Sequence, residues 1–478
     1  MSRSRFIVLA SLGMLVLVAC TAPRAPVTVT RLSVPALGLD AGAAPAIQAD
    51  WWRALGDPQL DRLVAAALAD NPTLEAALAR VRGAQSLLAT ADAARRPQLT
   101  VDGSVQRQRL SDAYIIPPPY GGSTRGIGDI QANLGWDLDF WGRQAAAVGQ
   151  ARAEAGAVAL DYAAARLALA GSVVQTYIDL ARSERQLATA QAVLDERSAA
   201  LGLVQLRARS QLDSGQAVRT AQTLLAEARQ DLVQAQARRE ALVHACALLA
   251  GRGADYYATL EPPVLVLDAA LPLPDTLPAD LLARRPDILA AQARITAAMA
   301  GREVARSDFY PNINLVGLAG VQAIGLGKLF TGDAATYGAG AAVHLPIFDG
   351  GRLRAAYAGA NARADGAVAD YNGAVLDAVR EAADALTRVQ SLARALEAQR
   401  EASAGITALQ RLEEARFGAG LGSRLQLIEA GLRALAAGQA VTDLEADQVT
   451  ARVRLLVALG GGFDPEHLAT VTDTRSSP

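Results

Sequence analysis

Few side chains in this sequence have the types and spacing that chemistry requires. The three histidines, His244, His344 and His467, are scattered, and His244 lies in a helical segment without a nearby serine or aspartate of triad type. No cluster of His and Cys has the spacing of a metal site. The glycine-rich run LGGGF ends a helical pattern instead of opening one, so it does not predict a phosphate-binding loop. We therefore expect a protein that is not an enzyme, with no catalytic residues, no metal and no cofactor.

The two cysteines stand in different contexts and make no disulfide framework. Cys246 lies in an apolar helical segment, where it fits as a small buried residue. Cys20 ends the motif LVAC after two arginines and the apolar run Phe6–Ala19, which has the length of a signal-peptide core. This motif resembles the bacterial lipobox, and the resemblance implies cleavage before Cys20 and covalent N-acyl and S-diacylglycerol lipid on it. The alternative is an ordinary secretory signal with a chance cysteine.

Composition favours long helices over a mixed α/β enzyme. Charged residues are 20% and aromatic residues 4%, and Ala, Leu, Gln and Arg are abundant. The 46 basic and 48 acidic residues nearly balance, which gives no support for nucleic acid as a partner. Beyond the N-terminus the sequence shows no apolar run long enough for a membrane-spanning helix. If the chain crosses a membrane, we expect a closed β-barrel.

The sequence contains an internal repeat. Asn71–Val81 (NPTLEAALARV) matches Arg285–Ile295 (RPDILAAQARI), and RPQLTV in the first half matches YPNINL in the second. Each half predicts a short helix, a strand, a loop, a strand, a very long helix, a turn and a long helix. The predicted parts are a signal peptide (1–19), a lipidated extended segment (20–56), the first repeat (57–255), a Pro-rich linker (256–280), the second repeat (281–462) and a C-terminal tail (463–478).

Two strands are predicted in each repeat, at about 97–110 and 127–140, and at about 311–322 and 337–348. Apolar and polar residues alternate clearly in the first pair and more weakly in the second. A tilted strand of about 12 residues covers roughly 28 Å, close to the hydrocarbon thickness of a bilayer. The alternative is a soluble four-stranded sheet packed on helices.

Four strands alone would expose two unpaired edges to lipid. Two chains would give eight strands, whose interior is filled by side chains, whereas three chains give twelve strands and room for a lumen. We therefore expect a homotrimer.

The long helices are predicted at about 142–209, 215–250, 351–417 and 422–460. The first, with a length of about 100 Å, carries a heptad stripe. Its members are Val173, Leu180, Leu187, Leu194 and Leu201. The alternative is a solid soluble bundle.

Glycine at the strand–helix junctions would let the backbone turn from strand to helix. The residues assigned to these junctions are Gly142, Arg143, Gly350, Gly351 and Arg352. The predicted fold class is thus mainly α with a membrane β-barrel: four strands per chain and a long helical coiled-coil tunnel.

Ordered motifs along nearly the whole chain resemble the TolC-like outer-membrane efflux proteins, in their NodT/OprM-like lipoprotein branch. They are WWRALGDPQLDRLVAAALADNP, WDLDFWGR, LPADLLARRPDILAAQARI, FYPNINL, PIFDGGR and RFGAGLGSRLQLIEA. The resemblance implies a trimer with a twelve-stranded barrel in the outer membrane and a twelve-helix periplasmic tunnel. It also implies a passive exit duct of a tripartite efflux pump for drugs or other toxic compounds, with a periplasmic adaptor and an inner-membrane transporter of the RND type as partners.

The resemblance further places a periplasmic gate at the helical turns. Family members often close this end with acidic residues of the second turn, which correspond to Gln426 and Glu429 here. Gln426 departs from the acidic pattern, and the first turn looks about one helical turn shorter than usual. Two alternatives to the efflux role are the exit channel of a protein or peptide secretion system and a periplasmic coiled-coil lipoprotein without a pore.

Overall fold

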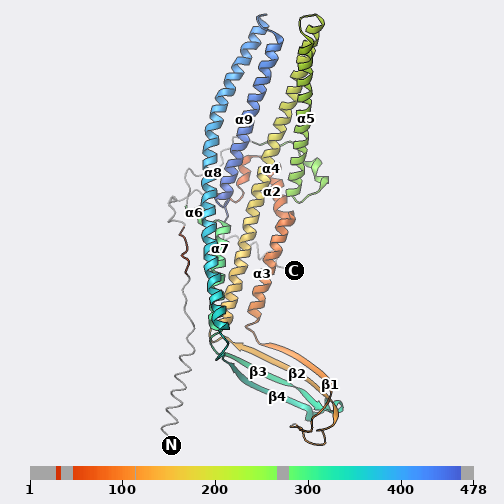
Figure 1. Cartoon of the computed structure of the whole chain (residues 1–478), viewed down its shortest axis with the longest axis vertical. Coiled ribbons are helices and arrows are strands. Elements are labelled where there is room, and N and C mark those ends of the chain that lie inside the picture. The colour runs from red at the N-terminus through yellow and green to blue at the C-terminus, as the bar shows by residue number, and fades with distance from the viewer. Residues whose placement is uncertain (1–27, 34–46, 114, 266–278, 464–478) are drawn as a thin grey trace. The chain divides into compact units, whose positions relative to one another are not determined.

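A computed structural model describes residues 28–33, 47–113, 115–265 and 279–463 (Figure 1). The predicted signal peptide, Cys20 and residues 464–478 lie outside these described residues. The chain is mainly helical with one four-stranded sheet, which confirms the predicted fold class at the level of the single chain.

The chain divides into two compact units. One comprises residues 1–31, 81–158 and 291–371, and the other comprises residues 32–80, 159–290 and 372–478. Each repeat contributes residues to both units, so the units do not follow the predicted repeat boundaries. This interleaving arises because the very long helix of each repeat starts in the first unit and ends in the second.

The first unit contains an antiparallel sheet with the strand order β1-β2-β3-β4 (Figure 1). Its strands are β1 (Gln98–Arg109), β2 (Thr124–Leu138), β3 (Asn312–Ile324) and β4 (Ala335–His344). β2 begins before the predicted residue 127 because Thr124 pairs with Arg109, the last residue of β1.

Two strands end earlier than predicted. β2 ends at Leu138 instead of residue 140, because the next residue, Asp139, turns to hydrogen-bond the start of the following helix. β4 ends at His344 instead of residue 348, where Pro346 has no N–H to donate to a ladder.

The two faces of the sheet differ in chemistry. Register rows such as Leu99–Leu134–Gly317–Ala339 and Val101–Ala132–Ala319–Tyr337 run across all four strands and make one face apolar. The opposite face carries most of the polar strand residues and has an open hollow of about 660 Å³ whose lining also includes glycines and apolar residues. Gln98, Thr100, Asn133, Val316 and Leu318 are among the residues that line this hollow.

Short helices precede the strands in each repeat. They are α2 (Pro58–Asp70), α3 (Pro72–Ala93), α6 (Ala279–Ala283) and α7 (Pro286–Ser307), with single 3-10 turns at Trp51–Leu55, Ala254–Thr259, Leu326–Lys328 and Gly332–Ala334. Three of these helices begin at proline, which fits the first helical position because its missing N–H would have no partner there.

Four long helices follow the strands: α4 (Arg143–Arg209), α5 (Gly215–Leu249), α8 (Arg352–Gly418) and α9 (Arg424–Ala458). All of their bounds lie within two residues of the predicted ones, a difference as small as that between methods of assigning helix ends. One described helix, α4, is long and apolar enough to cross a membrane, with a window of mean hydropathy 1.5 that is 44% buried inside the chain. The sequence had indicated no such window beyond the N-terminus.

In the second unit, α4 with α5 and α8 with α9 form antiparallel pairs (Figure 1). Arg239 binds Glu184 across the first pair and Arg400 binds Glu445 across the second, each at 2.7 Å. Arg182 of α4 binds Asp447 of α9 at 2.8 Å and joins the two pairs.

The predicted heptad stripe on α4 is only partly buried in the single chain. Val173 and Leu180 are fully buried, whereas Leu187, Leu194 and Leu201 remain partly exposed. The part of this stripe from Leu187 to Leu201 is therefore available for contacts with another chain.

Candidate functional site

The first strand–helix junction is built by a glycine and an acid. Gly142 has a φ of 75°, in the left-handed region that glycine enters without the steric cost of a Cβ. The Asp139 carboxylate accepts hydrogen bonds from the N–H groups of Gln144 (2.9 Å) and Ala145 (2.8 Å), which satisfies the first turn of α4. Arg143 binds Asp308 at 2.6 Å and so ties α4 to the segment after α7.

The second junction uses the same chemistry. Gly350 and Gly351 have φ values of 64° and 93°. The Asp349 carboxylate accepts from the N–H groups of Leu353 (2.7 Å) and Gly351 (2.9 Å), and these backbone hydrogen bonds lower the pKa of Asp349. Arg352 is exposed at the start of α8.

The glycines of both junctions were named from the sequence, but the capping acids were missed. The available signal was an aspartate three or four residues ahead of each helix.

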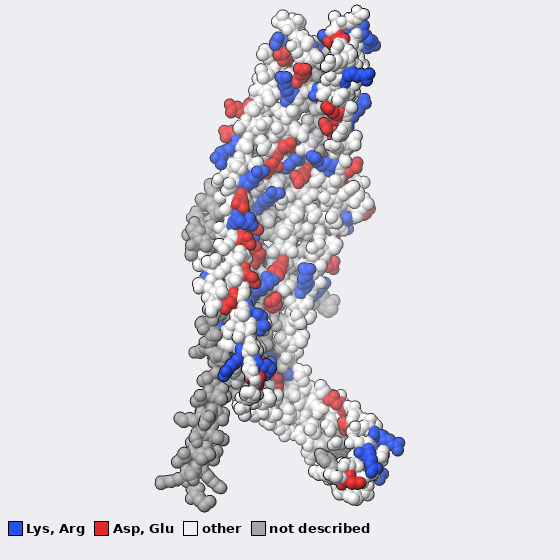
Figure 2. Space-filling model, viewed as in Figure 1, with Lys and Arg blue, Asp and Glu red and all other residues white. Residues whose placement is uncertain are grey.

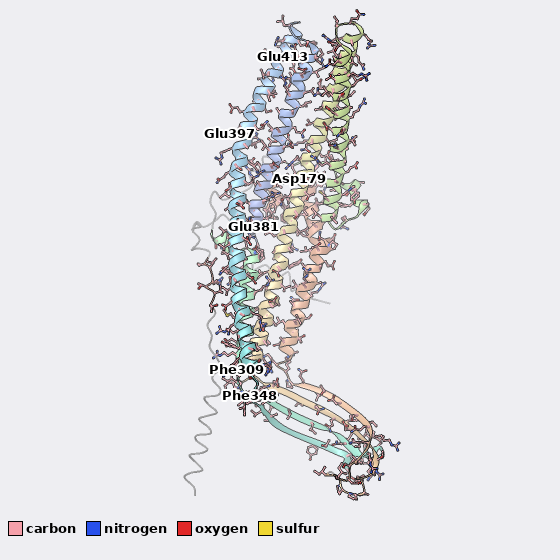
Figure 3. All side chains as sticks on the ribbon, viewed as in Figure 1. Asp179, Phe309, Phe348, Glu381, Glu397 and Glu413 are labelled. Atoms are coloured by element: carbon pink, nitrogen blue, oxygen red, sulfur yellow. The ribbon has the colours of Figure 1, made fainter. Side chains whose placement is uncertain are left out.

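Aromatic side chains surround these junctions. Trp141 stacks on Tyr310 with ring centroids 5.0 Å apart, and its indole N–H donates to the Pro311 carbonyl at 2.8 Å. Phe309 packs edge-on against Tyr357 of α8, and Phe348, between β4 and α8, is 93% exposed (Figure 3). An exposed aromatic belt at one end of a sheet is typical of a membrane interface.

The two helical turns have the same construction. In each, a leucine N–H bonds the carbonyl of an arginine five residues earlier at 2.8 Å: Leu212 to Arg207 and Leu421 to Arg416. The residue before each leucine is left-handed, Gln211 with a φ of 57° and Gly420 with a φ of 74°. This hydrogen-bonding pattern is the Schellman motif, which ends helices.

Both turns end in a serine cap and expose their leucine. Ser214 and Ser423 cap α5 and α9 by accepting N–H hydrogen bonds. Leu212 is 68% exposed and Leu421 is 74% exposed, so each turn presents an apolar side chain to its surroundings.

The predicted gate at Gln426 and Glu429 would form between copies, so the single chain shows only the local contacts of these residues. The Gln426 side-chain oxygen accepts from the Ser423 N–H at 2.9 Å, and the Ser423 hydroxyl accepts from the Gln426 N–H at 3.2 Å, which is a capping box. Gln426 is therefore committed to its own helix. Glu429 is exposed and has no ion pair among the described residues.

An N-terminal strap, residues 28–33, lies along α8 and was not foreseen in this detail. The Asp365 carboxylate accepts from the Thr28 N–H (2.7 Å), the Thr28 hydroxyl (2.9 Å) and the Val29 N–H (3.0 Å). The Val29 hydrogen bond is the largest cause of a lowered pKa of Asp365. Arg31 lies over the Tyr371 ring, 4.4 Å from its centroid.

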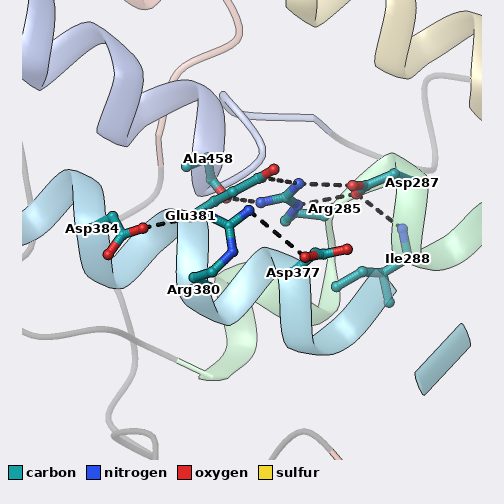
Figure 4. A network of polar contacts seen from close by, with 8 residues as sticks. All are labelled: Arg285, Asp287, Ile288, Asp377, Arg380, Glu381, Asp384 and Ala458. Carbon is teal, nitrogen blue, oxygen red and sulfur yellow. Dashed lines mark hydrogen bonds and ion pairs between the residues drawn. The ribbon is translucent and has the colours of Figure 1, made fainter. Parts of the chain in front are cut away.

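Arg285 is the centre of a polar network in the second unit (Figure 4). Its guanidinium binds Asp287 at 2.7 Å, Glu381 of α8 at 3.0 Å and the Ala458 carbonyl at the end of α9 at 2.8 Å. The side chain is only 11% exposed, so one residue joins the start of α7 to two long helices.

Cys246 is fully buried in α5, and burial raises the pKa of its thiol to about 12. A thiol with such a pKa is inert at neutral pH because the thiolate is the reactive form. In the part of the chain that the structure describes, no group of three or more His, Cys, Asp or Glu side chains could hold a metal ion.

These features define a class of protein: a mainly helical chain in which a sheet with one apolar face leads through capped junctions into helices about 100 Å long. The chain belongs to the outer membrane efflux protein family, whose model matches residues 63–252 and 277–461.

Known relatives agree with this assignment. The multidrug resistance outer membrane protein MdtP of Escherichia coli K12 is 31% identical over 87% of each chain. The fusaric acid resistance protein FusA of Burkholderia cepacia is 36% identical over 69% of this chain and 64% of its own length. The crystal structure of the outer membrane protein VceC of Vibrio cholerae is 32% identical and matches with a TM-score of 0.79, covering 87% of this chain and 100% of that one.

Proposed function

We propose that this chain is the passive exit duct of a tripartite efflux pump that expels drugs or other toxic small molecules across the outer membrane. The observation that carries the proposal is the two-faced sheet continuous with the long helices: an apolar face suited to lipid and an opposite face that carries most of the polar strand residues and suits a water-filled lumen. The duct needs no catalysis, and transport energy comes from an inner-membrane transporter of the RND type.

A homotrimer follows from the sheet edges. Among the residues that the structure describes, β1 and β4 each pair on one side only, and unpaired backbone groups are not tolerated in hydrocarbon. Pairing β1 of one copy with β4 of the next closes twelve strands around a lumen, with no free edge. The partly exposed outer part of the α4 stripe, from Leu187 to Leu201, would then pack between copies.

The N-terminal strap supports a lipid anchor on Cys20. From Thr28 to Leu32 the strap runs from Asp365 toward Asn372, away from the start of α8 at Arg352. The stretch of α8 from Arg352 to Asp365 is about 20 Å long. The chain between Cys20 and Thr28 can span at most about 28 Å, so lipid on Cys20 can reach a membrane at the junction.

The exposed leucines of the two turns, Leu212 and Leu421, are the proposed contact for a periplasmic adaptor. They occupy equivalent positions in the two repeats, so a closed trimer would present six such side chains in a ring. Exposed apolar groups at matching positions are typical of an interaction surface.

Single-channel recording on the purified protein in planar bilayers tests the duct. We expect discrete conductance steps together with a trimer that dissociates on heating in detergent. A protein that stays monomeric and never conducts would support the pore-free coiled-coil lipoprotein instead. The exit channel of a protein secretion system would conduct as well, and drug susceptibility of a deletion strain separates it from the efflux duct.

Thiol counting tests the lipid anchor. Lipid on Cys20 leaves Cys246 as the one free thiol, so the denatured mature protein should react with one equivalent of maleimide and the Cys246→Ser variant with none. One equivalent in the Cys246→Ser variant would mean that Cys20 is retained without lipid.

A further inference from the structure

We propose that Arg107 and Arg109 bind the phosphate groups of the phosphorylated glycolipid in the outer leaflet of the outer membrane. This inference rests on the proposed function, because it takes the apolar face of the sheet as the lipid-facing one. It concerns the end of the sheet farthest from the helices, where β1 runs into the loop before β2.

Both arginines lie on the apolar face. Residues of β1 alternate between faces, and Arg107 and Arg109 continue the series Leu99, Val101, Gly103 and Val105. The register agrees, because Arg107 pairs with Gly126 and Val105 pairs with Gly128.

Apolar side chains of the loop after β3 lie beside this face, together with the exposed Lys328 and Asp333 of the same loop. Leu326 lies against the Gly126 and Gly128 positions, and Phe330 on the same loop is 81% exposed. Charged residues gather at this end of the sheet, whereas the middle of its visible surface is nearly free of them (Figure 2).

The two arginines form no ion pair with any residue in the described ranges. Both are exposed. The nearest acidic residue in strand register, Asp129, lies on the polar face, where the Ser104 hydroxyl donates to it. An anion from outside the chain would therefore meet two free guanidinium groups.

Their height fits the outer boundary of the hydrocarbon layer. Leu99 and Arg107 are about 26 Å apart along the strand, which a tilt of about 40° reduces to roughly 20 Å of height. The apolar band of an outer-membrane barrel is about 25 Å tall, so Arg107 can extend its head group to the interface and Arg109 lies at it.

Phosphorylated glycolipid is the occupant that this chemistry selects. Guanidinium groups bind phosphate oxygens through two parallel hydrogen bonds, and arginines two residues apart on one strand face match a glycolipid with two phosphates better than a single-phosphate lipid. Residues on the lipid-facing side of an edge strand keep this exposure when β1 pairs with another copy, because pairing uses the backbone.

The test measures binding of bisphosphorylated lipid A to the purified full-length trimer in detergent, by native mass spectrometry. We expect the double variant Arg107→Gln/Arg109→Gln to bind bisphosphorylated lipid A about tenfold more weakly than wild type does. Wild type should bind dephosphorylated lipid A as weakly as the double variant binds the bisphosphorylated form. The matched control is Arg125→Gln: Arg125 lies at the same end of the sheet but on the polar face, where it donates to the Ser123 hydroxyl. This variant should bind like wild type.

Three results would overturn the proposal: equal binding by the double variant, equal weakening by Arg125→Gln, or binding of phosphatidylglycerol as tight as that of lipid A. The double variant should still conduct in planar bilayers. Normal conductance with unchanged lipid binding would remove this inference alone, whereas a wild-type protein without conductance would remove the duct itself.

Discussion

Asn71 and Arg285 occupy equivalent positions in the two repeats, and each donates a hydrogen bond to the last carbonyl of a long helix. The Asn71 amide binds the Leu249 carbonyl at the end of α5 at 2.9 Å, and the Arg285 guanidinium binds the Ala458 carbonyl at the end of α9 at 2.8 Å. Both residues precede the proline that opens α3 or α7. Both repeats therefore contain the same capping interaction, in which the residue before a short helix caps the end of a long helix.

The two capping interactions differ in strength. Asn71 makes a neutral hydrogen bond, whereas Arg285 also binds Glu381 of α8 (Figure 4). We predict that Arg285→Gln lowers the opening free energy of the last turn of α9 by about 2 kcal/mol, and that Asn71→Ala lowers that of α5 by about 1 kcal/mol. Hydrogen exchange of the helix-end amides measures both.

The adjacent arginine is the control for this prediction. Arg284 forms an exposed ion pair with Asp280 on the same short segment, and Arg284→Gln should change stability by less than about 0.5 kcal/mol. If Arg284→Gln and Arg285→Gln had equal effects, the cap on α9 would not be the cause.

The fold could be predicted from sequence wherever local patterns decide it. Alternation on Leu99, Val101 and Val105 located a strand, and the long proline-free stretch after Gly142 located α4. The strand ends were less accurate, because Asp139 and Asp349 turn away from the ladder to cap helices. An aspartate at a strand end can stay in the strand or cap the next helix, and no periodic pattern in the sequence distinguishes the two outcomes.

The site was predictable only in part. Glycines at the junctions could be named because few other residues take a left-handed backbone. The partners of Arg285 and Asp365 could not, since Glu381 and Thr28 lie far away in the sequence and only packing brings them close. The resemblance assigns Gln426 to a gate, which stays a prediction, and the local spacing S-x-x-Q could also have indicated its capping box.

The N-terminal strap should loosen when Asp365 loses its charge. The Asp365→Ala variant removes three hydrogen-bond acceptor contacts to Thr28 and Val29, so trypsin should cleave after Arg31 severalfold faster than in wild type. Asp370→Ala, an exposed acid five residues farther along α8, is the control and should leave cleavage unchanged. Equal cleavage rates in all three proteins would show that Asp365 does not hold the strap.

The strap should also respond to acid. The folded-state pKa of Asp365 is lowered, first by the Val29 hydrogen bond, so it lies below the unfolded value. The stabilisation is therefore complete above the unfolded-state pKa of about 4 and is lost as pH falls through the folded-state pKa. Hydroxyl-radical footprinting of residues 28–33 from pH 7 downward should show wild-type protection that is lost only at the acid end. The Asp365→Ala variant should lack this protection at every pH and show no such acid transition.

Exchanging the left-handed residues of the two helical turns should change the stabilities of the turns in opposite directions. Gln211 has a left-handed backbone at the position where the second turn has Gly420. A side chain in that conformation costs about 1 kcal/mol, so Gln211→Gly should stabilise the first turn and Gly420→Gln should destabilise the second by similar amounts. Exchange protection of the Leu212 and Leu421 amides reports each turn separately, and a loss of protection in Gln211→Gly would contradict the argument.

Glu429 is the acidic member of the predicted gate pair, whereas the uncharged Gln426 side chain forms the capping box of α9. In a closed trimer three Glu429 carboxylates near the axis would attract cations and repel one another. We predict that Glu429→Ala raises the leak conductance of the purified channel in planar bilayers. Glu397→Ala is the matched control, since Glu397 is an exposed acid on α8 away from the turn (Figure 3). Conductance that is unchanged in Glu429→Ala, or raised equally in Glu397→Ala, would remove Glu429 from the gate.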